Sequence, residues 1–345
     1  MRCTGKSKRY LKARRRRNRI VRIMVLFLIL QCIAAAGIYY LINHSKEQYL
    51  VAEYESSHYN KALYKGDLYS ADLCVSAENV DMNGAPDKNT FQAGGLFDLE
   101  GRKADFAYNI YERMYPASLT KLMTALVVFD SGTDLSETVV VSKNADARSF
   151  AADEQVCGIQ EGDQLSLESL LYGLLVYSGN DNAVAIAEHI SKTEAEFAEL
   201  MNKKAEEIMA TGSHFVNSNG LHNESHYTTA YDMYLIFNEC MKHEKFMEII
   251  EADSYTANIK RADGSDASVK WEPTNYYALG EADLPKSGKI IGGKTGTTLS
   301  AGNCLILLDE SDSGNPFISI VMGAKTKEIL YRDMTALIEG ISDVQ

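Results

Sequence analysis

The sequence predicts a mixed α/β protein of the α+β type, in which helices cover an antiparallel sheet of about five strands. Strand patterns lie at the start and at the end of the globular region, whereas helical patterns fill its middle. This segregation brings the first strands beside the last ones in one sheet. A basic stretch followed by an apolar run precedes the globular region, which we therefore expect on the far side of a membrane.

The N-terminal part divides into a basic tail and an apolar run. Residues 1–22 hold eleven Lys or Arg and no acidic residue. Residues 23–42 are almost wholly apolar and are long enough to span a bilayer as a helix. We expect an uncleaved transmembrane anchor, a polar stalk over 43–68 and a globular domain over 69–345. The alternative is a cleaved signal peptide, since Ala34-Ala35-Ala36 resembles a cleavage site.

The charge distribution separates the tail from the rest of the chain. The net charge is −12, and the residues after the tail keep 24 of the 35 basic residues and all 47 acidic ones. A basic run can bind nucleic acid, but its position directly before a spanning segment favours an orientation signal. We therefore expect a membrane partner through the N-terminal helix and no nucleic-acid partner.

Six cysteines are present, four of them in the globular region: Cys74, Cys157, Cys240 and Cys304. Four cysteines allow three pairings, between which the sequence does not decide. Their wide spacing is not typical of a disulfide framework or a zinc site, so we expect buried free thiols.

The strands are predicted from short apolar runs bounded by turn residues. A hairpin is expected because Glu100-Gly101-Arg102 separates two such runs. The predicted strands are Leu73–Val75, Gly95–Leu99, Lys103–Tyr108, Ile290–Lys294, Cys304–Leu308 and Phe317–Met322.

The helices are predicted from apolar residues at helical spacing and from capping residues. Thr193 with Glu196, and Thr229 with Asp232, have the spacing of a capping box, and Gly212 fits the end of the helix that Thr193 opens. The predicted helices are Ser118–Phe129, Leu165–Val176, Asn182–Ile190, Thr193–Thr211, one that starts at Thr229, and Lys327–Ile341.

Ser118 and Lys121 form the only S-x-x-K in the chain. Three residues apart on a helix, they lie on one face, where a neutral amine can take the hydroxyl proton. Ser118 also belongs to the first turn, where the helix dipole favours developing negative charge. The simpler interpretation is an N-terminal capping serine with a solvated lysine one turn later.

Two further sequence patterns, Lys-Thr-Gly and Ser-x-Asn, could act together with the S-x-x-K pattern. Lys294-Thr295-Gly296 follows two glycines on a predicted strand, where a lysine and hydroxyls can hold a carboxylate; an exposed edge lysine is the simpler alternative. Ser-x-Asn occurs three times. Ser142-Lys143-Asn144 and Ser313-Gly314-Asn315 fit turns next to strands, whereas Ser178-Gly179-Asn180 interrupts two apolar helices and can reach a cleft.

In the order S-x-x-K, S-x-N and K-T-G, the sequence resembles the penicillin-binding DD-peptidases, most closely the D-alanyl-D-alanine carboxypeptidases. The resemblance extends from about Tyr69 to the C-terminus. It rests on the segments Pro116–Ala125, Leu170–Asp181, Asn219–Leu221, Tyr227–Asp232 and Gly293–Gly302. Since 49 residues follow Gly296, we expect a single catalytic domain of the DD-peptidase and β-lactamase type.

The resemblance implies a role for each motif residue. Ser118 would attack the carbonyl between the two terminal D-alanines of a peptidoglycan stem peptide, and Lys121, with a pKa lowered by Lys294, would be the base. Ser178 would relay the proton to the leaving amine. Asn180 would hold Lys121 or the substrate amide.

The third motif is expected to bind the other end of the substrate. Lys294 and Thr295 would bind the terminal carboxylate, with Gly296 beside them, and the N–H groups of Ser118 and Thr297 would form the oxyanion hole. β-Lactams would act as acylating inhibitors, and neither a metal nor a cofactor is expected.

Three other functions fit the sequence less well. A class A β-lactamase needs a glutamate segment between the second and third motifs, which this sequence lacks. A zinc protease could use His222 and His226, but the glutamate position is wrong and Gly220 and Asn223 indicate a surface loop. A catalytically idle sensor on the same fold would also react with penicillin, but it would not turn over a peptide.

The position of the mature N-terminus tests the anchor. The apolar run continues from Ile38 to Ile42, beyond the possible cleavage site, so we expect the protein to keep residues 14–17 and to resist salt extraction. N-terminal sequencing of the membrane fraction measures this. A mature chain beginning at Gly37 would contradict the anchor and leave the assignment of the domain unaffected.

Overall fold

The computed structural model describes residues 16–34, 36–40 and 72–341. The chain forms two compact units, Met1–Ala71 and Asp72–Gln345. In the first unit, a helix spans Arg16–Tyr40 with a mean hydropathy of 2.3, which is long and apolar enough to cross a membrane. An anchor and a signal peptide both fit this helix. The predicted stalk over 43–68 and most of the basic tail lie outside the described residues.

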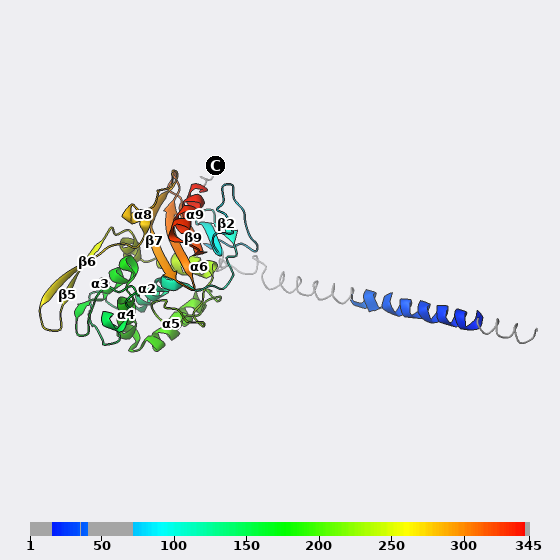
Figure 1. Ribbon diagram of the computed structural model, residues 1–345, viewed down its shortest axis with the longest axis horizontal. Helices are drawn as coiled ribbons and strands as arrows, with labels where there is room; N and C mark the ends of the chain where they lie inside the picture. Colours follow the sequence, from blue (N-terminus) through cyan, green and yellow to red (C-terminus); the bar gives the residue numbers. More distant parts are fainter. Residues whose placement is uncertain (1–15, 35, 41–71, 342–345) are drawn as a thin grey trace, which may run out of the picture. The chain divides into compact units, whose positions relative to one another are not determined.

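The second unit contains a five-stranded antiparallel sheet in the order β2-β1-β9-β8-β7 (Figure 1). Its first strand pairs with its last one, with Gly95 opposite Ile320, as the sequence predicted. The hairpin and the three C-terminal strands are also confirmed. The bounds are β1 (Ala93–Asp98), β2 (Lys103–Tyr108), β7 (Lys289–Thr298), β8 (Gly302–Glu310) and β9 (Pro316–Ala324).

Helices cover both faces of this sheet (Figure 1). The C-terminal helix α9 (Lys327–Glu339) packs on one face against alternate residues of β9, including Phe317 and Val321. The intervening residues Ile318 and Ile320 face the larger core on the other side. This alternation buries apolar side chains on both faces, which explains why the central strands carry almost no charge.

The helices between the strands supply the larger core. The capping predictions are confirmed, because Thr193 accepts the N–H of Glu196 and Thr229 accepts that of Asp232. The helix that Thr193 opens ends at Glu207, before the predicted end at Gly212. Two residues later, Met209 has a φ of 63°, which a helix cannot continue through. The bounds are α2 (Thr120–Ser131), α3 (Leu167–Tyr172), α4 (Asn180–Ser191), α5 (Glu194–Glu207), α6 (Ala230–Cys240), α7 (Glu244–Ile250) and α8 (Tyr276–Leu279).

Two sequence predictions need correction. Leu73–Val75 is not a strand, since the Cys74 N–H is bound by the Tyr234 hydroxyl instead of a neighbouring strand. The predicted helix Leu165–Val176 starts inside strand β4 (Gln164–Ser166) and ends as a π-helix over Gly173–Tyr177.

A second sheet was not predicted at all. It has four strands in the order β3-β4-β5-β6 and includes the projecting hairpin of β5 and β6 (Figure 1). Besides β4, its strands are β3 (Thr138–Val140), β5 (Tyr255–Lys260) and β6 (Asp266–Trp271). Only alternate residues of β5 are buried, Ala257 and Ile259, so its apolar signal is weak.

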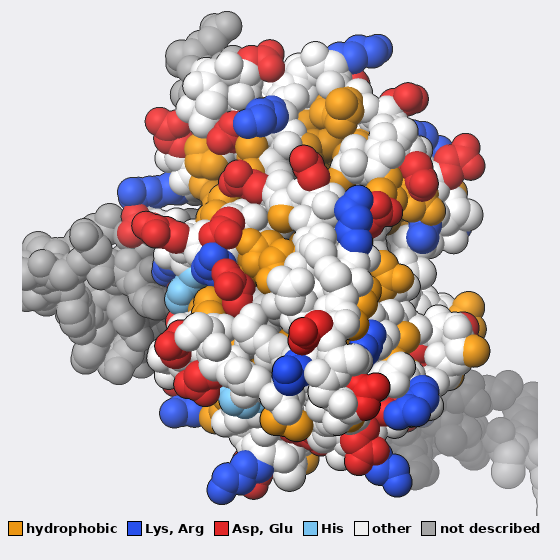
Figure 2. Space-filling view, turned by 90° about the vertical axis from the view of Figure 1, so that its left-hand side faces the viewer, with side chains coloured by type: hydrophobic (Ala, Val, Ile, Leu, Met, Phe, Trp, Pro, Cys, Tyr) orange, Lys and Arg blue, Asp and Glu red, His pale blue; other side chains and the backbone are white. Residues whose placement is uncertain are grey.

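The cysteines of the second unit are separate buried free thiols, as predicted: Cys74, Cys157, Cys240 and Cys304. Cys32 is exposed on the N-terminal helix, and Cys3 lies outside the described residues. On the face in Figure 2, acidic and basic side chains are interspersed, and apolar side chains form only small patches.

Packing of α9 on the sheet gives a test of the fold. Leu337 is fully buried there, so Leu337→Ala should lower the free energy of unfolding by about 2–5 kcal/mol. Leu200→Ala on α5 is the matched control, since Leu200 is 40% exposed, and should change it by less than about 0.5 kcal/mol. Chemical denaturation measures both. Equal losses would show that α9 does not pack as described.

Candidate active site

Ser118 lies in a short 3₁₀ turn, Ala117–Leu119, directly before α2. Ala117 has a φ of 48°, a strained value for a residue with a side chain. Gly220 packs so closely on the carbonyl of Ala117 that a Cβ atom there would clash. The sequence predicted a serine in the first helical turn, and the structure places it one step earlier, at the strained entrance to the helix.

Lys121 is fully buried below Ser118. Its Nζ lies 2.9 Å from Ser118 Oγ, 2.7 Å from Asn180 Oδ1 and 2.8 Å from the carbonyl oxygen of Asn219. Burial lowers the pKa of Lys121 to about 7. The sequence prediction gave Lys294 as the cause of this shift, whereas in the structure removal from water is the main cause.

The three contacts of Lys121 differ in whether the partner can only accept a hydrogen bond or can also donate one. The amide oxygen of Asn180 and the carbonyl of Asn219 can only accept hydrogen bonds. A neutral amine has two N–H groups and one lone pair, so both N–H groups are used by these oxygens. The lone pair then faces Ser118, whose hydroxyl can donate its proton. This geometry fits a general base with its proton acceptor already aligned on the serine.

The second motif, Ser178-Gly179-Asn180, directly follows the π-helix Gly173–Tyr177. Ser178 has a φ of 69°, and Gly179 leads into the first turn of α4 at Asn180. A Cβ at Gly179 would lie 2.5 Å from the Cys157 sulfur, so only glycine fits there. The two irregularities turn Ser178 and Asn180 toward the cleft instead of leaving them on a continuous helix.

The third motif lies on edge strand β7, where buried and partly buried residues alternate. Lys294 is buried, and its Nζ contacts Ser178 Oγ and the Thr295 carbonyl oxygen, each at 2.8 Å. Burial, with a smaller contribution from the charge of Lys121, lowers the pKa of Lys294 well below its usual value. A Cβ at Gly296 would lie 3.1 Å from the Ser118 nitrogen, so glycine lets the strand approach Ser118 closely.

These elements enclose an open cleft of about 730 Å³. Six of the eight predicted site residues line it: Ser118, Ser178, Asn180, Thr295, Gly296 and Thr297. The other two, Lys121 and Lys294, lie buried below its surface and contact the two serines. The structure therefore brings all eight predicted residues together.

Sequence reasoning missed three contributors to the cleft. The Asn219 carbonyl binds Lys121, Thr274 lies 2.5 Å from Thr295 through their hydroxyls, and the Gln155 carbonyl accepts the Asn180 N–H at 2.8 Å. Two of these act through the main chain, which side-chain patterns do not reveal. The Asn219-Gly220 turn belongs to the segments that carry the family resemblance, and it is the one sequence signal near this carbonyl.

The remaining polar patterns lie elsewhere. Ser142 follows β3 and bonds Glu188, and Ser313 lies in the turn between β8 and β9, as expected. The segment from His222 to His226 is not helical, but His226 is buried instead of lying on the surface. Its ring bonds the Thr120 hydroxyl and accepts the Val216 N–H. No cluster of three His, Cys, Asp or Glu suited to a metal occurs within the part of the chain that the structure describes.

Comparison with known proteins identifies the family. Residues 95–326 match a family model described as D-alanyl-D-alanine carboxypeptidase. The chain belongs to the D-alanyl-D-alanine carboxypeptidase family. It is 30% identical over 249 residues to the D-alanyl-D-alanine carboxypeptidase DacF of Bacillus subtilis, covering 71% of this chain and 60% of that protein. It is 31% identical to DacA of Haemophilus influenzae, covering 73% of this chain and 62% of that one. The chain thus spans about three fifths of these relatives.

Solved structures agree with the fold of this family. A mutant of the DD-transpeptidase of Streptomyces K15 superposes with a TM-score of 0.67 at 25% identity, covering 73% of this chain and 97% of that chain. Penicillin binding protein 5 of Haemophilus influenzae gives 0.64 at 27% identity, covering 77% and 72%. The predicted fold, helices on an antiparallel sheet of the DD-peptidase type, is confirmed.

The pKa of Lys121 gives a pH-dependent prediction for this family member. A labelled penicillin should acylate Ser118, and the rate should fall as the pH drops through about 7, because the protonated amine cannot take the serine proton. Lys121→Ala should slow acylation by roughly 10²–10⁴ and abolish this pH dependence. Lys143→Ala, at an exposed loop position, is the control and should behave as the wild type.

Mass spectrometry of the adduct locates the acylated residue. Ser118→Ala should give no adduct that survives denaturation. Labelling that persists in this variant would contradict the assignment of the nucleophile.

Proposed function

We propose that this chain is a serine-type D-Ala-D-Ala carboxypeptidase that removes the terminal D-alanine from peptidoglycan stem peptides. Membership of the family supports the reaction class. The observation that carries the proposal is the arrangement around Lys121, whose Nζ lies 2.9 Å from Ser118 Oγ and also contacts two carbonyl oxygens. The neutral amine can donate to both carbonyl oxygens and keep its lone pair for the proton of Ser118. An ordinary capping serine with a solvated lysine, the simpler interpretation, does not fit a fully buried amine.

Acylation begins when the hydroxyl oxygen of Ser118 attacks the carbonyl carbon of the penultimate D-alanine while its proton passes to Lys121. The tetrahedral oxyanion is stabilised by the backbone N–H groups of Ser118 and Thr297. The close approach of β7 to the 3₁₀ turn at Gly296 supports this pairing of donors. The C–N bond then breaks, and the leaving amine takes a proton through the Ser178 hydroxyl.

The terminal carboxylate of the substrate binds beside Lys294 and Thr295. Burial favours the neutral form of Lys294 in the free protein, and the arriving anion favours the ammonium form. The Thr295 hydroxyl, held by Thr274, supplies a neutral hydrogen bond to the same group. Recognition of a free carboxylate would restrict the enzyme to chain ends, as a carboxypeptidase requires.

Water completes the cycle by hydrolysing the ester on Ser118, with Lys121 as the base for the attacking water. Each step uses side chains and backbone N–H groups of this protein together with water. β-Lactams act on the same groups, because their ring carbonyl acylates Ser118.

We further propose that the protein is a single-pass membrane protein with its catalytic domain outside the cytoplasm. The apolar helix Arg16–Tyr40 and the basic residues before it support this orientation. Peptidoglycan lies outside the cytoplasm, so the substrate and the domain would share a compartment.

Substrate turnover tests the proposal. The full-length protein in detergent should release D-alanine from a pentapeptide ending in D-Ala-D-Ala, which an idle sensor would not do. Lys294→Ala should lower kcat/KM for this peptide by roughly 10², since it removes the partner of the carboxylate. On an ester donor without a carboxylate, the same variant should lose less than about tenfold, whereas Lys121→Ala should lose activity on both donors.

Comparing the peptide donor with the ester donor distinguishes a wrong division of roles between the lysines from a wrong activity. Equal losses for Lys294→Ala and Lys121→Ala on the ester would contradict the division of roles between the two lysines. Absence of D-alanine release by the wild type, with Ser118 still acylated by penicillin, would contradict the carboxypeptidase activity itself.

A further inference from the structure

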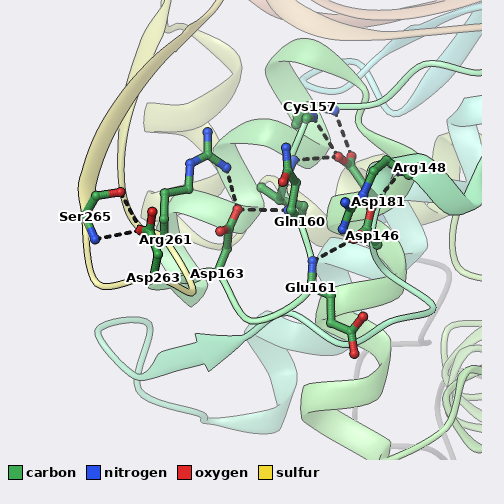
Figure 3. Close-up of polar contacts among 12 residues, drawn as sticks. Asp146, Arg148, Cys157, Gln160, Glu161, Asp163, Asp181, Arg261, Asp263 and Ser265 are labelled. Carbon is green, nitrogen blue, oxygen red and sulfur yellow. Dashed lines mark hydrogen bonds and ion pairs between the residues drawn. The ribbon is translucent and has the colours of Figure 1, made fainter.

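Asp181 directly follows the cleft residue Asn180 but is not among the residues that line the cleft. It is buried, and its carboxylate accepts backbone N–H groups from three successive residues (Figure 3). These are Cys157 at 2.8 Å, Gly158 at 2.9 Å and Ile159 at 3.2 Å. Hydrogen bonds from N–H groups to a carboxylate are among the stronger ones in proteins. Asp181 therefore fixes the start of α4 to the segment Cys157–Ile159.

The segment that Asp181 holds forms one wall of the cleft. Asp153, Glu154 and Gln155 line the cleft immediately before Cys157. The Gln155 carbonyl in turn accepts the Asn180 N–H at 2.8 Å. The wall and the S-x-N motif are thus joined at two points, one through Gln155 and one through Asp181.

The other end of this segment has its own carboxylate anchors. Asp163 accepts the N–H of Gln160 at 2.8 Å, and Asp146 accepts that of Glu161 at 2.9 Å (Figure 3). Asp163 is also paired with Arg261, so its charge is balanced. Three aspartates therefore hold one loop, and Asp181 is the one adjacent to the catalytic motif.

Asp181 also differs from the other two in its electrostatic surroundings. Two groups oppose the effect of burial on Lys121 and favour its ammonium form, the Cys157 thiol and the Asp181 carboxylate. Burial raises the pKa of Cys157 well above its usual value, so the thiol is neutral near pH 7. The charge of Lys121 also lowers the pKa of Lys294, because the two ammonium groups would repel each other. Burial raises the pKa of Asp181 above its usual value, and the backbone N–H groups that it accepts oppose this shift by favouring the charged carboxylate. Of the two acidic groups that act on Lys121, Asp181 is the one whose charged form is held by hydrogen bonds from three successive N–H groups.

We propose that Asp181 is a positioning residue that aligns Asn180 and the cleft wall and is the buried counter-charge of the Lys121 base. This role rests on the proposed function, in which Lys121 takes the proton of Ser118. Without the carboxylate, the ammonium form of Lys121 loses its favourable partner and its pKa falls. Because the neutral amine is the active form, acylation then continues to lower pH than in the wild type.

The pH profile of penicillin acylation tests this role. In Asp181→Asn, the midpoint of the acidic limb should move down by roughly 0.5–1 pH unit, and the plateau rate should fall by roughly tenfold as Asn180 loses its alignment. Asp146→Asn is the matched control, since it removes an anchor from the far end of the same loop. Its midpoint should stay within about 0.2 unit of the wild type. An unchanged midpoint in Asp181→Asn, or an equal shift in Asp146→Asn, would overturn the proposal.

Two further variants keep the test decisive. Asp181→Ser is also uncharged and can accept an N–H, so it replaces Asp181→Asn if that variant does not fold, and the same shift is expected. Asp181→Glu keeps the charge and should keep the midpoint, even where its plateau falls. A midpoint in Asp181→Glu that moves as far as in the uncharged variants would also overturn the proposal.

Penicillin acylation separates this proposal from the function on which it rests. Failure of the wild type to release D-alanine would contradict the carboxypeptidase activity, while the acylation profile would still report on Lys121 and Asp181.

Discussion

Removing an ammonium group from water costs several kcal/mol unless an anion compensates for it, and this domain buries two lysine side chains beneath one cleft. Lys121 and Lys294 meet neutral oxygens at hydrogen-bonding distance, and neither forms a direct ion pair within the described part of the chain. Burial therefore favours their neutral forms. Lys121 contacts Ser118, and Lys294 contacts Ser178. The lowered pKa of Lys121 sets the pH above which its amine can take the proton of Ser118.

The backbone around the two amines departs from regular structure in a consistent way. Ala117 and Ser178 have positive φ values, each costing about 1–3 kcal/mol, and each stands at the entrance to a helix. Gly296 allows strand β7 to approach the first of these turns. The five-stranded sheet and the helices on both of its faces supply the packing that maintains this strain. Regular elements thus carry the two lysines, and the strained turns present the two serines that the lysines contact.

The sequence predicted the central sheet, and it named eight residues that the structure brings together at one cleft, because each left a local signal: alternation, a capping pair or a motif with fixed spacing. It failed where structure depends on distant partners. The β5–β6 hairpin buries few apolar residues, and its Asp263-Gly264 turn passed unnoticed among polar neighbours. The backbone at Cys74 is bound by Tyr234, 160 residues away. The Asn219 carbonyl belongs to the main chain, and no side-chain pattern points to it.

The four separate thiols of the second unit have a consequence for the proposed location of this domain outside the cytoplasm. Burial raises the pKa of each one, so the thiolate, the form that reacts with oxidants and disulfides, is scarce at neutral pH. The native state of this unit contains no cross-link among the residues described. Because the buried thiols react slowly, the folded domain should tolerate both reducing and oxidising surroundings.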